Sequence, residues 1–88
     1  MQRYKITVTG KVQGVFFRQT AKEVADRLSL TGFARNEPDG SVHIEVEGEK
    51  AALQDFLEWC RKGPKAATVS AVRYTEGPIA GFIGFKTE

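Results

Sequence analysis

The chain has 88 residues, too few for a two-domain enzyme with a cleft between its domains, so we expect a single domain over residues 1–88. Hydrophobic residues make up 41% and charged residues 27% of the chain, as in folded globular proteins and unlike disordered segments. The net charge of +2 is too small for a surface that follows nucleic-acid phosphates. The composition therefore predicts a small folded domain with no nucleic-acid partner.

Cysteine content and hydropathy predict the cellular compartment of the protein. Cys60 is the single cysteine, which excludes an internal disulfide and a cysteine-based metal site and favours a reducing compartment. The longest uncharged run, residues 77–85, is far shorter than the roughly 20 apolar residues of a membrane-spanning helix. The first residues lead directly into a strand pattern and not into a signal peptide. We expect an unprocessed cytoplasmic protein with no membrane partner.

A strand and a helix are predicted in the first third of the chain. Apolar and polar residues alternate over residues 4–9, the period of a half-buried strand, which stops at Gly10. From Phe17 onward apolar residues recur at helical spacing, charged residues fill the other face, and Gly32 closes the helix. The residues between these elements form a strand-to-helix connection.

A hairpin is predicted next. Residues 33–37 and 41–47 are extended stretches separated by Pro38-Asp39-Gly40, in which proline presets the turn and glycine supplies a positive φ. In the second strand the even-numbered residues are expected to face the core, and the odd-numbered residues, His43, Glu45 and Glu47, to face outward.

The last third of the chain completes a recognisable plan. Residues 53–62 carry a helical apolar stripe that ends at Gly63-Pro64. Residues 69–75 predict a fourth strand and residues 82–85 a short fifth. The order βαββαβ is the split βαβ, ferredoxin-like plan of an α+β protein, an antiparallel sheet with both helices packed on one face. A monomer is expected, with a weak dimer through a sheet edge as the alternative.

The connection over residues 10–18 is the segment best suited to bind an anion. It contains neither the Walker pattern nor the dinucleotide-binding fingerprint. Gly10 and Gly14 let consecutive N–H groups converge, and the following helix begins with its positive end nearby. Arg18 places a cation in the first helical turn, where the helix dipole disfavours one, which suggests a bound anion. The residues alone leave open an ordinary turn with a solvated Arg18.

Asn36 is the second candidate, just before the hairpin turn. By strand parity it shares a face with Ala34 and opposes Phe33, so if Phe33 faces the helices, Asn36 faces the open side of the sheet. An asparagine near a turn often only bonds the local backbone. Two other reactive side chains are not expected to form a site: His43 should be an exposed strand residue, and Cys60 a small core residue.

Two segments carry the motifs of a known family. Residues 8–18, VTGKVQGVFFR, look like the phosphate-loop signature of acylphosphatases. Residues 32–36, GFARN, followed by DGSV at 39–42 and by Gly48, look like their second signature. The two signatures stand at the right separation and in the right order of elements. The chain therefore resembles the acylphosphatase family over nearly its whole length, with Phe33 standing where many members carry tryptophan.

The resemblance implies a hydrolase that splits acyl phosphates into carboxylate and phosphate with no metal and no other cofactor. By the resemblance, Arg18 binds the phosphate and is catalytic, and Asn36 positions the attacking water. The backbone N–H groups of Gln13, Gly14, Val15 and Phe16 would cradle the phosphate. The expected partner is a small-molecule acyl phosphate.

Two non-enzymatic readings are the alternatives. One is a phosphate- or anion-binding module without catalysis, and the other is an RNA-binding module of the same plan. RNA-recognition domains stack bases on aromatic side chains of their central strands. The outward positions expected here, residues 5, 7 and 9 and residues 43, 45 and 47, carry no such aromatics and include two acids.

Overall fold

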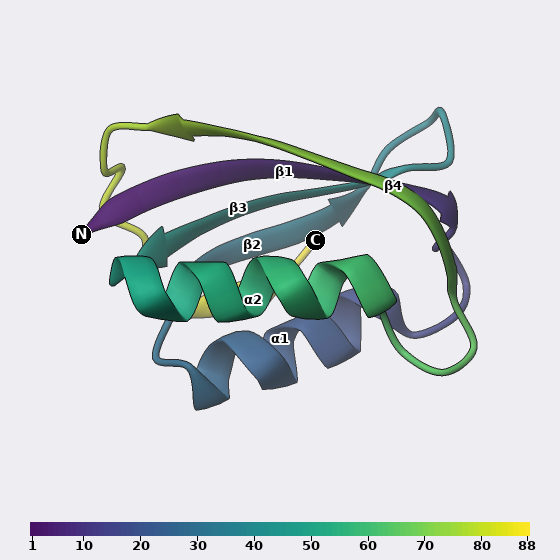
Figure 1. Cartoon of the computed structure of the whole chain (residues 1–88), viewed down its shortest axis with the longest axis horizontal. Coiled ribbons are helices and arrows are strands. Elements are labelled where there is room, and N and C mark those ends of the chain that lie inside the picture. The colour runs from purple at the N-terminus through teal and green to yellow at the C-terminus, as the bar shows by residue number, and fades with distance from the viewer.

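A five-stranded sheet carries both helices on one face (Figure 1). The computed structural model describes residues 1–88. In chain order the elements are β1 (Gln2–Lys11), α1 (Phe17–Arg27), β2 (Thr31–Asn36), β3 (Val42–Gly48), α2 (Lys50–Lys62), β4 (Thr68–Gly77) and β5 (Phe85–Thr87). The strand order is β4-β1-β3-β2-β5, antiparallel throughout except for the parallel pair β2 and β5. The predicted α+β, ferredoxin-like plan is confirmed.

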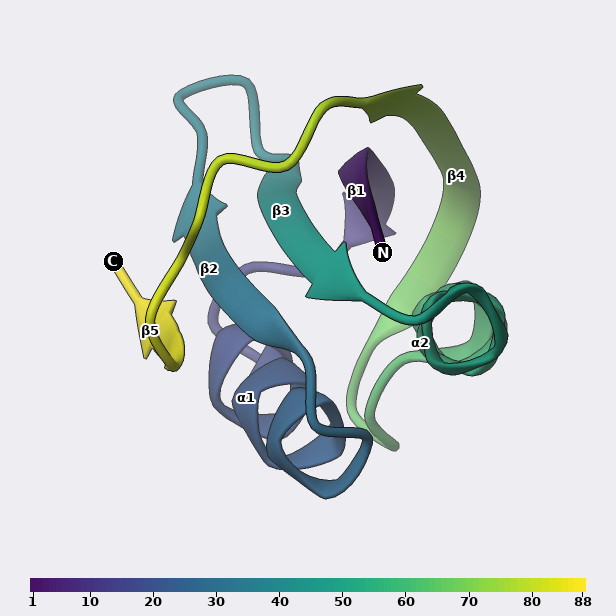
Figure 2. The same cartoon turned by 90° about the vertical axis from the view of Figure 1, so that its left-hand side faces the viewer.

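Both helices lie on the same side of the sheet (Figure 2), and the buried residues of the core come from the sheet and from the two helices. Helix α1 packs under β2 and β5, and α2 packs under β4, β1 and β3. Ile6 and Ile44 of the sheet are fully buried, as the alternation predicts. The rings of Phe17 and Phe56 lie 5.1 and 5.9 Å from that of Trp59, which joins the two helices through aromatic contacts.

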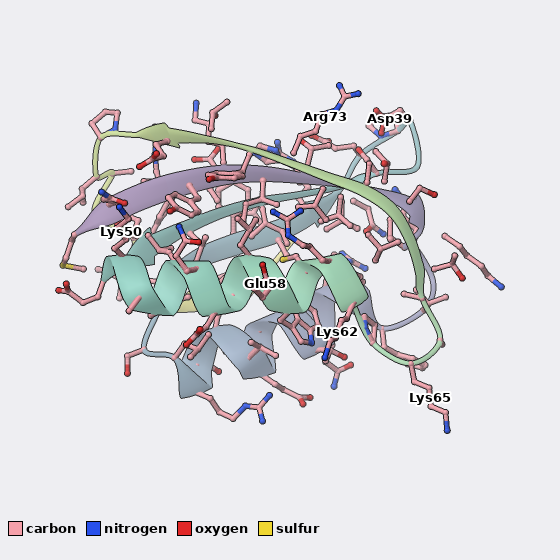
Figure 3. All side chains as sticks on the ribbon, in the orientation of Figure 1. Asp39, Lys50, Glu58, Lys62, Lys65 and Arg73 are labelled. Atoms are coloured by element: carbon pink, nitrogen blue, oxygen red, sulfur yellow. The ribbon has the colours of Figure 1, made fainter.

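The charged side chains of α2 lie at the surface. Lys50, Glu58 and Lys62 are exposed (Figure 3), whereas Leu53 and Phe56 on the same helix are completely buried. This separation is that of an amphipathic helix with one face on the core. Neither helix has the length and hydropathy needed to cross a membrane.

Gly10 does not end the first strand as predicted. Strand β1 continues to Lys11, and its register with β4 shifts between Thr9 and Gly10. Gly10 has φ 123°, and a Cβ there would lie 2.3 Å from the carbonyl oxygen of Thr68. The glycine therefore allows a bulge against β4 and does not terminate the strand.

Gly32 does not end the first helix as predicted. Helix α1 ends at Arg27, with Leu28 as its C-cap and Ser29 at φ 59°. Gly32 lies inside β2 at φ 150°, where a Cβ would stand 1.9 Å from the carbonyl oxygen of Glu45. The glycine is required by the close approach of β2 and β3.

The last strand begins later than predicted. It comprises Phe85–Thr87 and not residues 82–85, and it runs parallel to β2. Phe85 is 3% exposed, and its ring lies 6.2 Å from that of Phe56. Residues 78–84 form a loop that leads from β4 at one edge of the sheet to β5 at the other.

Glu47 was predicted to face outward but is only 2% exposed. The loop over residues 78–84 covers it, and the N–H groups of residues 80–82 donate hydrogen bonds to its carboxylate. Burial acts to raise the pKa of Glu47, but the three N–H donors and the Arg3 guanidinium outweigh it, so its pKa lies below the usual range. The charged carboxylate thereby holds the loop against β3.

We expect the charged form of Glu47 to stabilise the fold. Because its pKa is lowered by folding, this contribution is complete above the pKa of the unfolded chain and is lost as the pH falls through the folded value. Glu47→Gln should lower the free energy of unfolding by about 1–3 kcal/mol at pH 7 and by less at pH 3. Urea unfolding at both pH values measures the difference, with the exposed Glu23→Gln as control. An equal loss at both pH values would contradict a role for the charge.

Candidate active site

An open hollow of about 320 Å³ is lined by residues where β1 ends, α1 begins and β2 ends. These three element ends lie at one end of the molecule (Figure 1). Its wall includes Gly14, Phe16, Arg18, Gln19, Asn36 and Thr87. Arg18 is the only ionisable side chain in the wall. A hollow with one cation and no acid is suited to an anion.

The β1–α1 connection, residues 12–16, is fastened to the core at two points. Val12 and Val15 are 1% and 7% exposed, whereas Gly14 and Phe16 lie at the surface. Gly14 has φ 72° and Phe16 has φ 65°, a left-handed conformation that costs a non-glycine residue roughly 1–2 kcal/mol. The backbone N–H groups of residues 13–16 donate to no backbone carbonyl. The loop is a strained but anchored turn with free donors.

Helix α1 begins without a side-chain cap. Phe16 occupies the N-cap position without a capping hydrogen bond, and the first turn contains no acidic residue. The first bonded turn is closed by Thr20, whose N–H and hydroxyl donate to the carbonyl oxygen of Phe16 at 3.0 and 2.8 Å. The N–H groups of residues 17–19 precede this bond and are left for a ligand or water.

Arg18 stands in this first turn and is half-buried. Its Nη1 donates a hydrogen bond to the backbone oxygen of Glu88. Arg3, in contrast, is paired with the carboxylate of Glu45 at 3.2 Å. The Arg18 guanidinium is thus oriented by a main-chain oxygen, and no acidic side chain forms an ion pair with it.

Asn36 lies on the helix-facing side of the sheet, because the condition of the sequence inference, that Phe33 faces the helices, is not met. Ala34, which shares its parity, is completely buried, and so is its cross-strand neighbour Val42. Phe33 faces the open side instead, with its ring 5.9 Å from that of His43. The loop over residues 78–84 covers Phe33 there, which the local pattern does not show. This orientation is what brings Asn36 to the hollow.

The side-chain oxygen of Asn36 has no hydrogen-bond partner in the protein although it is buried. Leaving a buried acceptor unpaired costs about 1–3 kcal/mol, and such atoms are rare. Gln2 and Arg3 also have one unpaired buried atom each, but only Asn36 belongs to the wall of the hollow. The site therefore contains an acceptor that the fold does not use.

Gln13 has a role that sequence reasoning missed. Its Nε2 donates to the carbonyl oxygens of Glu37 and Ser41, at 2.7 and 2.9 Å, and ties the β1–α1 connection to the β2–β3 hairpin. Within that hairpin Asp39 accepts hydrogen bonds from the Ser41 hydroxyl and N–H, which lower the pKa of Asp39. No local signal reveals the Gln13 contacts, because the partners are 24 and 28 residues away.

The predicted site residues divide into two groups. Arg18, Asn36, Gly14 and Phe16 line the hollow, whereas Gln13 and Val15 do not. Val15 is a core residue, so its contribution to a ligand site is limited to its backbone.

The two reactive residues expected to lie outside a site do so. Cys60 is completely buried, as predicted, and burial raises the pKa of its thiol. His43 is half-buried and not exposed as predicted, since its Nε2 lies 3.1 Å from Glu45 on the open face. The chain contains no cluster of three or more His, Cys, Asp or Glu side chains that could hold a metal ion.

A second hollow of about 370 Å³ lies beside β5. Its wall includes Phe33, Phe82 and Ile83, together with Lys86 and Glu88 of opposite charge. Unlike the first hollow, it has an acidic residue in its wall, and none of its wall residues has an unpaired buried side-chain acceptor. Although it is slightly larger, we place the candidate active site in the first hollow.

Comparisons with known proteins agree with this architecture. The acylphosphatase family model matches residues 4–87. An acylphosphatase of Rubrobacter xylanophilus is 44% identical, and the aligned region covers 91% of this chain and 73% of that protein. An acylphosphatase of Marinobacter nauticus is 43% identical, and the aligned region covers 99% of this chain and 96% of that protein. The crystal structure of acylphosphatase from Bacillus subtilis superposes with a TM-score of 0.97 at 37% identity, covering 100% of this chain and 99% of that one. An acylphosphatase structure from Coxiella burnetii gives 0.95 at 36% identity, covering 99% and 92%. The chain belongs to the acylphosphatase family of hydrolases, as its two signatures predict.

We expect Gln13→Ala to weaken the link between the loop and the hairpin. The change removes two hydrogen bonds, although both carbonyl oxygens keep a backbone N–H donor within the hairpin, and it should lower the free energy of unfolding by about 1–2 kcal/mol. Urea unfolding measures the loss, and Gln54→Ala, which removes one hydrogen bond to the Tyr4 hydroxyl far from the loop, is a matched control. If Gln13→Ala were as stable as the wild type, these contacts would not restrain the loop.

Proposed function

We propose that the chain hydrolyses acyl phosphates to carboxylate and inorganic phosphate without a metal ion or other cofactor. Arg18 and backbone N–H groups hold the phosphate, and Asn36 positions the attacking water. The observation that carries this proposal is the single hollow whose wall combines a cation without an acidic side-chain partner, residues 14 and 16 with free N–H groups, and an unpaired buried acceptor. Membership of the acylphosphatase family supports the reaction class.

The phosphate is held by donors that are already in place. A guanidinium has five N–H donors, and the Glu88 oxygen occupies only one nitrogen of Arg18, so a two-pronged contact with phosphate remains available. The N–H groups of residues 13–16 and of the first turn of α1 add further donors. In the transition state negative charge spreads over the phosphoryl oxygens, and preorganised donors stabilise it.

The attacking water needs orientation more than it needs a base. The unpaired oxygen of Asn36 supports a role as the acceptor that aligns the water, because an amide oxygen accepts a hydrogen bond but takes up no proton. Water attacks phosphorus, the bond to the acyl oxygen breaks, and the electron pair leaves with the carboxylate. The proton of the water passes to a phosphate oxygen.

The leaving group makes an acid unnecessary. A carboxylate leaves at neutral pH because the pKa of its acid is about 4, like those of Asp and Glu. The wall of the hollow accordingly needs no acid, and it carries none. Magnesium prefers carboxylate ligands beside the phosphates. We therefore assign to Arg18 the charge neutralisation that a metal performs in other phosphoryl-transfer enzymes.

The two non-enzymatic alternatives account for less of the structure. An anion-binding module would use Arg18 and the N–H groups but leaves the unpaired Asn36 oxygen unexplained. An RNA-binding module would use the open face, where Glu45 pairs with Arg3 and with His43 and where no row of exposed aromatic rings lies.

Hydrolysis of benzoyl phosphate, followed by ultraviolet absorbance, tests the proposal. The wild type should hydrolyse it rapidly with a chelator present, and Arg18→Ala should reduce kcat/KM by at least about 100-fold. Arg18→Lys should also lose most activity, since a point charge does not reproduce the two-pronged grip. Arg27→Ala, at the exposed end of the same helix, is the matched control. Activity that requires an added metal, or an active Arg18→Ala enzyme, would refute the proposal.

Asn36→Ala separates water positioning from phosphate binding. We expect kcat to fall by about 100-fold, while the inhibition constant of inorganic phosphate stays within about threefold of the wild type. Asn36→Asp should not restore activity, because it adds a negative charge beside an anionic substrate. Lost phosphate affinity with unchanged kcat would contradict the assigned role.

A further inference from the structure

We propose that the Phe16 ring is the binding surface for the acyl group and that it makes the enzyme prefer aromatic over small acyl groups. This inference rests on the proposed acyl phosphate hydrolysis and adds the residue that distinguishes one substrate from another. Three properties of Phe16 carry it: its exposure, its backbone conformation and its place in the same hollow as Arg18 and Asn36.

Phe16 is the only apolar side chain of the hollow that is open to solvent. It is 73% exposed, whereas the other apolar wall residues, Val12 and Phe17, are each 1% exposed. A single exposed apolar side chain requires no explanation by itself. Phe16 differs from Ile83, which is 88% exposed, because it shares its hollow with Arg18. An apolar group attached to a phosphate bound at Arg18 is therefore within reach of the ring.

The backbone holds the ring out of the core. Phe16 has φ 65° and ψ 22°, a conformation disfavoured for an aromatic residue, while the next residue, Phe17, turns inward and packs on Trp59. The carbonyl oxygen of Phe16 accepts two hydrogen bonds from Thr20, which fixes the residue at the start of α1. Strained residues held in this way are concentrated at ligand sites. With the backbone held, only the two side-chain torsions of Phe16 remain to be ordered when a ligand covers the ring.

The in-line geometry of phosphoryl transfer sets the direction in which the acyl group leaves. The attacking and leaving oxygens lie roughly in line through phosphorus. With the water held by Asn36, which reaches the hollow from β2, the acyl group leaves away from Asn36, and the β1–α1 connection is another part of the wall. Phe16 is the apolar surface of that wall. An aromatic acyl group covers the ring by offset or edge-to-face packing, and an acetyl group is too small to do so.

The test compares kcat/KM for benzoyl phosphate and acetyl phosphate in the wild type and in Phe16→Ala. Both substrates carry the same phosphate, so any disturbance of the phosphate cradle cancels in the ratio of the two values. We expect the benzoyl-to-acetyl ratio to fall by about threefold to tenfold, mainly through a higher KM for benzoyl phosphate. Phe16→Asn should show the same fall, because asparagine tolerates the left-handed conformation but offers no ring.

Ile83→Ala is the control, since it removes an exposed apolar side chain outside the hollow. It should leave the ratio as in the wild type. The inference about Phe16 is overturned if the ratio is unchanged in both Phe16 variants, or if it falls equally in Ile83→Ala. The proposed function stands in that case, provided that the wild type hydrolyses both substrates and Arg18→Ala does not. A wild type that hydrolyses neither substrate overturns the proposed function and this inference with it.

Discussion

The short connection between β1 and α1 is the constraint on which the whole site depends. Val12 and Val15 anchor it in the core, so the backbone between and after them must turn outward through the left-handed conformations of Gly14 and Phe16. The same turn starts α1 at Phe17, which places Arg18 in the first helical turn. Loop N–H groups and a guanidinium are thus brought to one hollow by hydrophobic anchoring, without any contact between the two.

Two buried polar groups show how the fold separates stability from function. Glu47 is nearly inaccessible, but N–H groups of residues 80–82 satisfy its carboxylate and Arg3 offsets its charge. The Asn36 oxygen is also buried, but it has no partner in the protein. A buried group that is satisfied holds the structure together, whereas one left unpaired carries a cost that only a ligand or water removes. The first holds the loop that leads to β5, and the second belongs to the hollow.

Local patterns predicted most elements because burying one face of a strand or helix gives the apolar residues of the sequence the period of that element. The alternation along β1 and β3 and the apolar stripe of α2 follow directly from facing the core. The predicted ends of the first strand and the first helix were wrong, because the glycines placed there lie in contacts between strands. Gly10 forms a bulge against β4, and Gly32 makes room for a β3 carbonyl oxygen. Glycine marks a special backbone, but the local sequence does not say which neighbour demands it.

The sequence by itself determined the α+β plan, the family and the residue types of the candidate site, because periodicity and two compact motifs are local properties of the chain. Only the tertiary structure decided which side of the sheet Asn36 faces and that Glu47 is covered. It also showed that Gln13 joins the loop to the hairpin. Each of these depends on a segment at least 24 residues away, such as the loop over residues 78–84. Contacts of that separation are set by how the layers pack, and no local pattern encodes them.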